Sequence, residues 1–310
     1  MTYLVGANFP ATPAGQRFRN MMLATGIMQI PGAHNGQAAL QAKDRGFDAL
    51  YLSGAAMTAS MGLPDLGIIT IDEVCFFIRQ VVRASGLPVL VDGDTGYGET
   101  LNVMNMVRAF EEAGAAAVHI EDQILPKKCG HLNDKKLVSP YEMAQKVAAA
   151  ARARRDMVII ARTDAAGSEG LEGAVARARL YHEAGADAIF PEALVSADMF
   201  REFSRQLPDV PLLANMTEFG RSPYFTASEF EQMGYSMIIW PVSSLRAANK
   251  AQADLYDTLA RNGSTEEMLG RMQTREELYK TLRYYDYETL DAGIVATVLP
   301  HVGQSDRSAA

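Results

Sequence analysis

The chain has 310 residues, of which 48% are apolar and 21% charged, values usual for a globular protein with a well-buried core. Its formal net charge is −8 and its basic residues form no long run, which argues against nucleic-acid binding. The first residues lack the pattern of an export signal, and no segment has the roughly 18 uninterrupted apolar residues needed to cross a bilayer, so we expect a cytoplasmic protein without a membrane partner.

Eight short apolar runs alternate with stretches of helical periodicity. The runs are IMQI from Ile27, ALYL from Ala49, PVLV from Pro88, AVHI from Ala117, MVIIA from Met157, AIF from Ala188, PLLA from Pro211 and MIIW from Met237. Several helical stretches end in a glycine just before the next run, as in EAGAAAVHI, which fits a left-handed helix C-cap. Such continuous apolar strands, separated by amphipathic helices, predict parallel strands buried on both faces.

Eight units of this kind can close into a barrel or form a doubly wound sheet. Polar motifs follow most of the runs, among them SG, DGD, EDQ, RTD, PEA and NMTEFG. In a barrel these strand ends meet on the one face where barrel enzymes keep their chemistry, whereas a doubly wound sheet would scatter them. We therefore predict an α/β fold of the (β/α)8 TIM type, as a single domain over residues 1–310.

Three segments lie outside the simple repeat. We expect a helical segment at about residues 12–25 and a helical extension at about 263–297, whose sequence RMQTREELYKTLRYYDYETL reads as a tyrosine-rich amphipathic helix. Residues 121–140 are longer than the usual βα connection, and loops of that length often act as lids. The motif KKCGH, which contains one of the two cysteines, lies on this predicted lid.

Four acidic residues are candidates for a metal site. Asp92 and Asp94 follow the third run with a spacing of two, which would turn both carboxylates toward the barrel mouth, and Asp65 and Glu121 could join them. Oxygen ligands without a cysteine and histidine cluster suit Mg²⁺, or Mn²⁺ as an alternative. Taken alone, a D-x-D motif after a strand indicates a helix-capping turn about as often as a metal site.

Basic residues could balance these acids and bind carboxylates. Arg162, Arg246 and Lys127 are the candidates, because arginine grips a carboxylate at two points. Cys129 has Lys127, Lys128 and His131 close in sequence, and positive surroundings lower the pKa of a thiol toward neutrality, where it can exchange protons efficiently. Gly130 would let the backbone approach a ligand, although a surface loop with an incidental cysteine remains the alternative. Cys75, in an apolar helical run, reads as core packing.

The motifs YLSG, GLPDLG, VDGDTGYG, HIEDQ, KKCGH, ARTDA, FPEA, NMTEFG and MQTREELY, taken together, resemble the isocitrate lyase and phosphoenolpyruvate mutase superfamily over about residues 20–295. The resemblance implies a Mg²⁺-dependent carbon–carbon lyase that splits 2-methylisocitrate into pyruvate and succinate, as in propionate catabolism through the methylcitrate cycle. It also implies a homotetramer in which the last barrel helix is exchanged between subunits.

The same resemblance implies a role for each site residue. Asp92 would bind the metal directly, and Asp65, Asp94 and Glu121 would hold its waters. Cys129 would be the general acid that protonates the succinate carbanion, with Lys127 beside it. The identity of the base does not follow from the sequence, and Tyr51 and a metal-linked carboxylate are both candidates. The substrate's carboxylates and its pyruvate-like half would be surrounded by Ser53, Gly54, Gly130, His131, Arg162, Glu192, Asn215, Thr217 and Arg246.

Other activities use similar parts. A 2,3-dimethylmalate lyase or another oxyacid lyase would need the same metal and thiol, and the chain's Ala55, Ala56 and VDGD depart from the commoner family pattern in ways that touch substrate choice. Isocitrate lyases usually have much longer chains, and the intact KKCGH with Arg246 favours a tricarboxylate lyase over a phosphonomutase. A barrel without catalysis is the remaining reading, disfavoured by the co-occurrence of acids, thiol and arginines.

Overall fold

The computed structural model describes residues 2–6, 10–128, 130 and 135–298. Its eight strands are β1 (Met28–Pro31), β2 (Leu50–Leu52), β3 (Val89–Asp92), β4 (Ala117–Glu121), β5 (Val158–Thr163), β6 (Ala188–Pro191), β7 (Leu213–Asn215) and β8 (Met237–Trp240). Each strand lies within two residues of a predicted run. Strands β2 to β6 are buried along their whole length, as their nearly continuous apolar runs predict, whereas β1 has only Ile30 buried.

The strands are all parallel and form a closed ring. Five of them pair in the order β2-β3-β4-β5-β6 and three in the order β1-β8-β7. Single bridges join the two sets at both seams, between Gly32 and Tyr51 and between Ile189 and Leu212. The ring is therefore the predicted (β/α)8 barrel rather than a doubly wound sheet.

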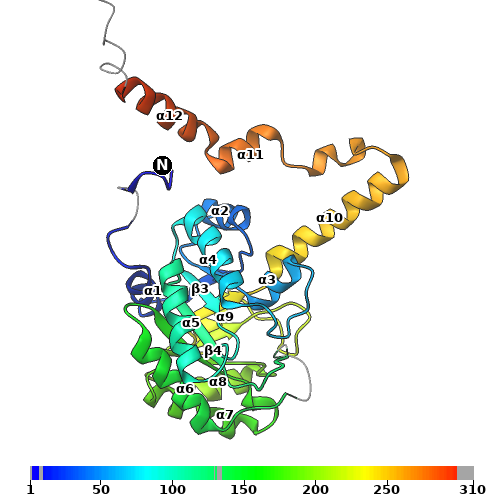
Figure 1. Cartoon of the computed structure of the whole chain (residues 1–310). Helices are drawn as coiled ribbons and strands as arrows, with labels where there is room; N and C mark the ends of the chain where they lie inside the picture. The colour runs from blue at the N-terminus through cyan, green and yellow to red at the C-terminus, as the bar shows by residue number, and fades with distance from the viewer. Residues whose placement is uncertain (1, 7–9, 129, 131–134, 299–310) are drawn as a thin grey trace, which may run out of the picture. The chain divides into compact units, whose positions relative to one another are not determined.

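Helices surround the strands (Figure 1). The helices of the barrel region are α1 (Ala14–Met22), α2 (Gly36–Asp44), α3 (Gly54–Ser60), α4 (Ile71–Ser85), α5 (Thr100–Ala113), α6 (Pro140–Ala153), the short 3-10 helix η2 (Ala165–Gly167), α7 (Gly170–Glu183), α8 (Ala197–Gln206), α9 (Ala227–Gln232) and α10 (Ser243–Asn262). Several of them end as the sequence predicts; Gly86 and Gly114, for example, are left-handed C-caps of α4 and α5.

The core has two layers. An inner cluster fills the barrel with side chains from the strands, including Ile160, Phe190 and Ile239, and α1 adds Phe18 to it. An outer cluster lies between strands and helices and includes Cys75, which is buried as predicted. This two-layer packing holds the strand ends, and the polar residues that follow them, in fixed positions.

The chain divides into two compact units, Ala11–Asp254 and a second unit of Met1–Pro10 with Leu255–Ala310. The first contains the whole barrel. The second contains the end of α10, the 3-10 helix η3 (Glu266–Arg271), α11 (Arg275–Leu282) and α12 (Tyr284–Val298). The tyrosine-rich stretch is two helices rather than the one predicted, because Arg283 between them is left-handed, with φ of 55°.

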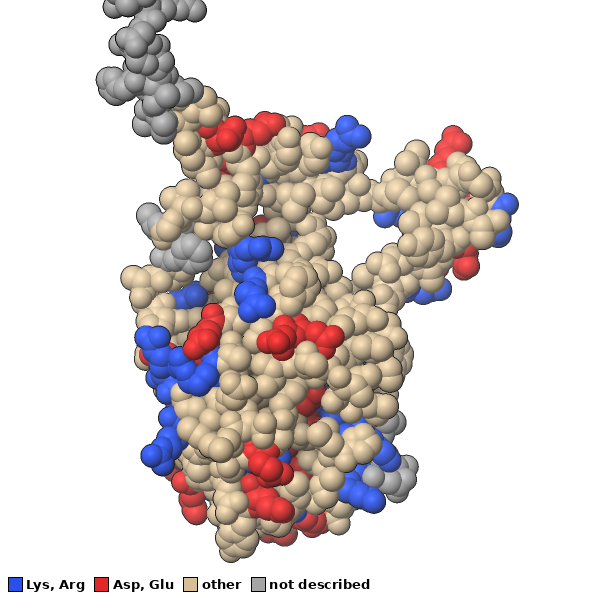
Figure 2. Space-filling view, viewed as in Figure 1, with Lys and Arg blue, Asp and Glu red and all other residues tan. Residues whose placement is uncertain are grey.

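Charges of both signs are interspersed over the face seen in Figure 2. Among the described residues, no helix is both long and apolar enough to cross a membrane.

Candidate active site at the carboxyl ends of the strands

The predicted site residues lie where the parallel strands end. Register pairs Asp92 with His119, and Glu121 with Arg162, on neighbouring strands. Buried polar residues gather at this end of the barrel, namely Ser53, Asp92, Asp94, Glu121, Lys127, Arg162, Glu192 and Thr217. The closed ring thus brings together residues that are more than 160 positions apart in the sequence.

Lys127 links the acidic residues. Its ammonium lies 2.6 Å from Asp65 Oδ1 and 2.6 Å from Asp94 Oδ1, and its side chain is 3% exposed. Asp92 accepts hydrogen bonds from the main-chain N–H groups of Gly54, at 3.0 Å, and Asp94, at 3.1 Å. Asp94 itself is in a left-handed turn with φ of 46°, so the two carboxylates converge through that turn and not through the predicted strand alternation.

Burial and charge set the protonation of these acids. Burial disfavours ionisation of Asp92, but His119, Lys127, Arg162 and the Gly54 N–H outweigh it and lower the pKa of Asp92 below its usual range. Burial, together with the charges of Asp92 and Asp65, raises the pKa of Asp94 to about 6, although Lys127 opposes this. Asp92 is therefore ionised at neutral pH.

The donor set fits a magnesium ion held by few protein ligands. Among the described residues, no three histidine, cysteine or acidic side chains converge as direct ligands. Mg²⁺ commonly takes one or two carboxylates and keeps its waters. Asp92 is ionised, and Glu121 Oε1 is buried without a hydrogen-bond partner in the described chain, as an acceptor for such a water would be.

Tyr51 and His119 form a buried pair beside Asp92. The Tyr51 hydroxyl lies 2.8 Å from His119 Nε2 and 3.5 Å from Asp92 Oδ2. Burial lowers the pKa of His119 to about 4 despite the nearby Asp92 charge, so the ring is neutral at pH 7. Burial and Asp92 also raise the pKa of Tyr51 well above its usual value, so Tyr51 is a neutral phenol.

Arg162 is held by carboxylates on several sides. Asp164 accepts two hydrogen bonds from it, Nε to Oδ2 at 2.9 Å and Nη2 to Oδ1 at 3.1 Å. Glu121 Oε2 lies 3.1 Å from Nη1 and Glu192 Oε2 lies 3.7 Å from Nε. Burial lowers the pKa of Arg162, but these acids, led by Asp164, raise it well above its usual value, so the guanidinium is a permanent cation.

The other predicted substrate residues lie on the same end of the barrel. The Asn215 amide donates to Glu192 Oε2 at 3.2 Å. Arg246 Nη1 donates to Thr217 Oγ1 at 3.3 Å and to Glu218 Oε2 at 2.8 Å, and the Arg246 side chain is 41% exposed. An arginine held by one carboxylate and partly open to solvent can receive a ligand carboxylate.

Ser53 and Gly54 begin α3 at the edge of the acidic group. The Ser53 hydroxyl caps this helix by accepting from the Ala56 N–H, and Gly54 contacts Asp92 directly. The structure therefore gives Ser53 a capping role in addition to the substrate role that was predicted.

The KKCGH motif is only partly described. Cys129 and His131, the predicted acid and one predicted substrate residue, lie outside the described residues. Gly130 is buried against the site: a Cβ atom there would come within 2.2 Å of Glu192 Cγ and 2.7 Å of Arg162 Nη2. Only glycine fits this position without displacing both side chains.

Sequence reasoning missed the residues that hold the predicted ones. Asp164, Asp122 and Glu218 are within or next to the quoted motifs, yet none was assigned a role. Asp122 is fully buried and accepts from Thr163 Oγ1 at 2.8 Å, Tyr181 Oη at 2.9 Å and the Asp164 N–H at 2.9 Å. The sequence did carry a signal for two of them: an acidic residue directly follows each of strands β4 and β5, namely Asp122 in EDQ and Asp164 in RTD.

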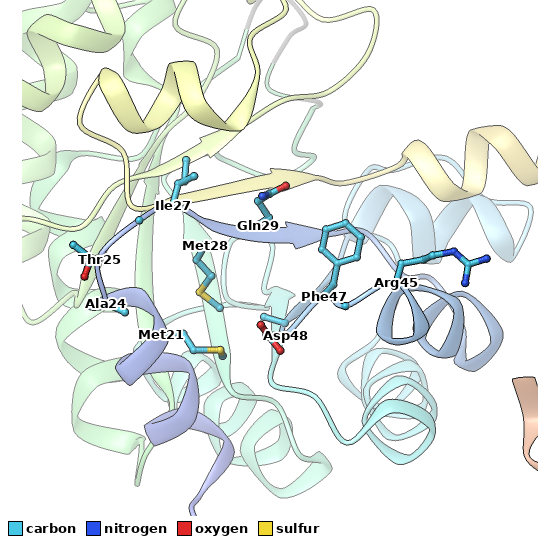
Figure 3. Close-up of a pocket in the computed structure, with 12 residues that line it drawn as sticks. Met21, Ala24, Thr25, Ile27, Met28, Gln29, Arg45, Phe47 and Asp48 are labelled. Atoms are coloured by element: carbon cyan, nitrogen blue, oxygen red, sulfur yellow. The ribbon is translucent and has the colours of Figure 1, made fainter.

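A separate cavity lies at the opposite end of the barrel. It has a volume of about 510 Å³ and is lined by residues before and at the start of β1 and by residues before β2, among them Met21, Met28, Phe47, Arg45 and Asp48 (Figure 3). None of the predicted site residues lines it, and the amino ends of barrel strands serve stability more than chemistry.

Comparison with known proteins gives the family. A family model described as phosphoenolpyruvate phosphomutase matches residues 18–260. A Bacillus subtilis protein named 2-methylisocitrate lyase is 55% identical over 97% of this chain and 99% of its own length, and one of the same name from Aeropyrum pernix is 50% identical over 92% of both chains.

Solved structures agree with the sequence comparison. A 2,3-dimethylmalate lyase, described as a member of the PEP mutase/isocitrate lyase superfamily, has a TM-score of 0.86 and 35% identity, over 92% of this chain and 96% of that one. A phosphoenolpyruvate phosphomutase from Streptomyces platensis subsp. rosaceus has a TM-score of 0.85 and 31% identity, over 92% of this chain and all of that one. The chain therefore belongs to the phosphoenolpyruvate mutase and isocitrate lyase superfamily.

Proposed function

We propose that this chain is a Mg²⁺-dependent lyase that cleaves the carbon–carbon bond of 2-methylisocitrate to give pyruvate and succinate. The observation that carries the proposal is the 55% identity, over nearly the full length of both chains, with a protein named 2-methylisocitrate lyase. The barrel mouth supports it, because ionised Asp92 and the cationic Arg162 and Arg246 provide for a metal and for the carboxylates of such a substrate. This activity would belong to propionate catabolism through the methylcitrate cycle, in the cytoplasm.

The proposed metal site follows from the acids. Asp92 would bind Mg²⁺ directly, and Asp94, Asp65 and Glu121 would hold its waters. When bound, the ion supplies positive charge that stabilises the oxygens of the substrate's reacting half. Lys127, paired with Asp65 and Asp94, would keep the net charge of this acidic group low.

The proposed reaction needs one base and one acid. The base takes the proton of the substrate's tertiary hydroxyl. The electron pair of that oxygen then forms the carbonyl of pyruvate. At the same time the carbon–carbon bond breaks, and its electron pair stays on the succinate carbon. Cys129 would donate its thiol proton to that carbon. The acid must be protonated and close to the carbanion, which is why we assign it to the thiol of KKCGH.

The base is one of two groups beside Asp92. Tyr51 lies 3.5 Å from the Asp92 carboxylate, but its raised pKa keeps it a neutral phenol, so added positive charge would have to drive loss of its own proton to solvent before it could act as a base. Glu121 is the carboxylate alternative. Burial raises its pKa well above the usual value, so it too needs positive charge, which Arg162 and Lys127 supply in part, to be ionised and act as a base.

The C-terminal helices support a proposal about assembly. Several of their apolar side chains are exposed in the single chain, including Tyr285 at 64%, Ile294 at 54% and Val295 at 51%. Such a surface fits burial against another subunit. We therefore propose a homotetramer in which the last helix is exchanged between subunits.

A product assay tests the proposed function. The purified protein would be incubated in parallel with 2-methylisocitrate, isocitrate and 2,3-dimethylmalate, each with Mg²⁺, with Mn²⁺ and with a chelator. We expect pyruvate and succinate from 2-methylisocitrate, little reaction with the other two acids, and loss of turnover in the chelator. Faster cleavage of 2,3-dimethylmalate, which the likeness to a 2,3-dimethylmalate lyase structure makes the second candidate, would overturn the substrate assignment.

A further inference from the structure

Lys135 joins two parts of the candidate site. Its ammonium donates to the main-chain carbonyl of Gly130 at 2.6 Å and to Asp164 Oδ1 at 2.6 Å. The Lys135 side chain is 8% exposed and that of Asp164 is fully buried. Both contacts are therefore shielded from solvent, where charge-assisted hydrogen bonds are strongest.

The contact with Asp164 reaches the substrate-binding region. The same carboxylate holds the guanidinium of Arg162 at two points. Gly130, at the other end of the Lys135 bridge, packs directly on Arg162 and Glu192, as its missing Cβ shows. Lys135, Asp164, Arg162 and Gly130 thus form a closed ring of contacts.

Gln123 holds the other side of the same short segment. Its amide oxygen accepts from the Lys128 N–H at 2.9 Å, and its amide nitrogen donates to the Lys128 carbonyl at 2.8 Å. Gln123 is 2% exposed and directly follows Asp122, which is itself tied to Thr163. The residues before and after Cys129 in the sequence are therefore both tied to buried side chains of the barrel.

We propose that Lys135 and Gln123 are positioning residues, which fix the main chain at Gly130 and Lys128, on either side of the proposed acid Cys129 in the sequence. This inference deepens the proposed function and rests on it for the role of the thiol. The anchoring itself does not, because it is a property of the protein without substrate. A purely structural role for Lys135 would instead affect global stability and leave the local exchange at Gly130 unchanged.

The adjacent Lys136 provides a matched control. It belongs to the same connection and has the same charge, but it is exposed. Lys135→Met and Lys136→Met therefore remove the same charge from neighbouring positions. Lys135→Met also removes the bridge to Gly130 and Asp164, whereas Lys136→Met leaves that bridge in place. Lys135→Arg keeps a cationic donor, and Gln123→Leu removes the second anchor independently.

Hydrogen exchange of the substrate-free full chain, followed by mass spectrometry, is the first test. We expect Lys135→Met to speed exchange of the amides at residues 128–130 by roughly tenfold or more, and to leave residues 158–163 of β5 unchanged. Lys136→Met should match the wild type. Wild-type exchange at residues 128–130 in both Lys135→Met and Gln123→Leu would overturn the proposal.

Steady-state kinetics is the second test. Because a displacement of about 1 Å can cost on the order of 10²-fold in rate, Lys135→Met should lower kcat by roughly 10- to 100-fold with KM changed less than about threefold. Lys135→Arg should recover most of the loss. A loss expressed in KM alone would overturn the positioning role. If the wild type cleaves none of the three acids, the proposed function fails, and the exchange result alone still decides whether Lys135 anchors Gly130.

Discussion

Gly54 lies directly against the carboxylate of Asp92: its N–H donates to Asp92 Oδ2 at 3.0 Å, and a Cβ atom at Gly54 would come within 2.9 Å of the same oxygen. The same Cβ would lie 3.3 Å from Asp94 Oδ1. The first residue of α3 thereby limits where both carboxylates can be. A change at Gly54 therefore acts on the acidic group without touching the barrel core.

Gly54→Ala should weaken metal binding more than it weakens the fold. The added methyl group pushes on two carboxylate ends, which can move at small cost, but a shift of several tenths of an ångström is enough to spoil a preorganised site. We expect the Mg²⁺ concentration for half-maximal activity to rise by roughly tenfold and the free energy of unfolding to change by less than about 1 kcal/mol. Activity titrations with Mg²⁺ and urea unfolding measure the two effects.

Gly167→Ala is the control for that substitution. Gly167 is exposed in η2, and a Cβ atom there would meet nothing within 4 Å. Its Mg²⁺ titration should match that of the wild type. If Gly54→Ala also matches the wild type, the carboxylates beside it do not hold the metal.

Local pattern made the barrel and the strand-end residues predictable. Asp92, Glu121 and Arg162 each end or follow a continuous apolar run, and the ring closure brings such positions together whatever lies between them. The apolar runs were enough to predict where these residues lie, because a strand that is buried on both faces needs apolar residues along most of its length.

The supporting contacts were not predictable in the same way. The partners of Asp122 include Tyr181, which lies 59 positions away on α7, and no spacing rule relates the end of β4 to a residue on the second α-helix after it. The left-handed residues Asp94 and Arg283 were not predicted, because such a conformation at a residue other than glycine is set largely by its surroundings, even at aspartate, where it is commoner.

Asp122→Asn should destabilise the barrel. Asp122 is a buried anion with three close donors and with Arg177 Nη1 at 3.4 Å, so an amide in its place leaves Arg177 short of negative charge. Removing one partner of a buried ion pair costs about 3 to 5 kcal/mol, and Glu169, which also binds Arg177, should hold the loss near the lower value. Urea unfolding gives the number.

Asp198→Asn supplies the comparison for Asp122. Asp198 pairs with Arg201 at 3.1 Å on the surface of α8, and its side chain is 95% exposed. Such pairs contribute little because water screens them. Equal unfolding midpoints for Asp122→Asn and the wild type would mean that the Asp122 contacts do not stabilise the fold.

Cys129→Ser should remove turnover and retain binding. A serine hydroxyl is a far weaker acid than a thiol, so the proposed proton donation to the succinate carbon would be lost, with a fall in kcat of roughly 10²- to 10⁴-fold. Binding of Mg²⁺ and of succinate, measured by calorimetry, should change less than about threefold, since neither needs the proton. Near-normal kcat in Cys129→Ser would refute the assignment of the acid.

Cys75→Ala separates that effect from a general effect of losing a thiol. Cys75 is buried in α4, and burial raises the pKa of its thiol. It should therefore be inert, and its replacement should leave kcat within about twofold of the wild-type value.

His119 should make the fold sensitive to acid. Its pKa is about 4 in the folded chain, chiefly because of burial, against 6.5 for the exposed ring. Above pH 6.5 the ring is neutral in both states and its contribution to stability is complete. As the pH falls from 6.5 to 4, the unfolded chain takes up a proton that the folded chain does not, so this contribution is lost, in total about 3 kcal/mol.

The measurement is the free energy of unfolding of the wild type and of His119→Gln from pH 7 to pH 4, in a chelator. Because glutamine does not titrate, the advantage of the wild type should shrink by about that amount over this range. A difference that stays constant would show that His119 titrates alike in both states.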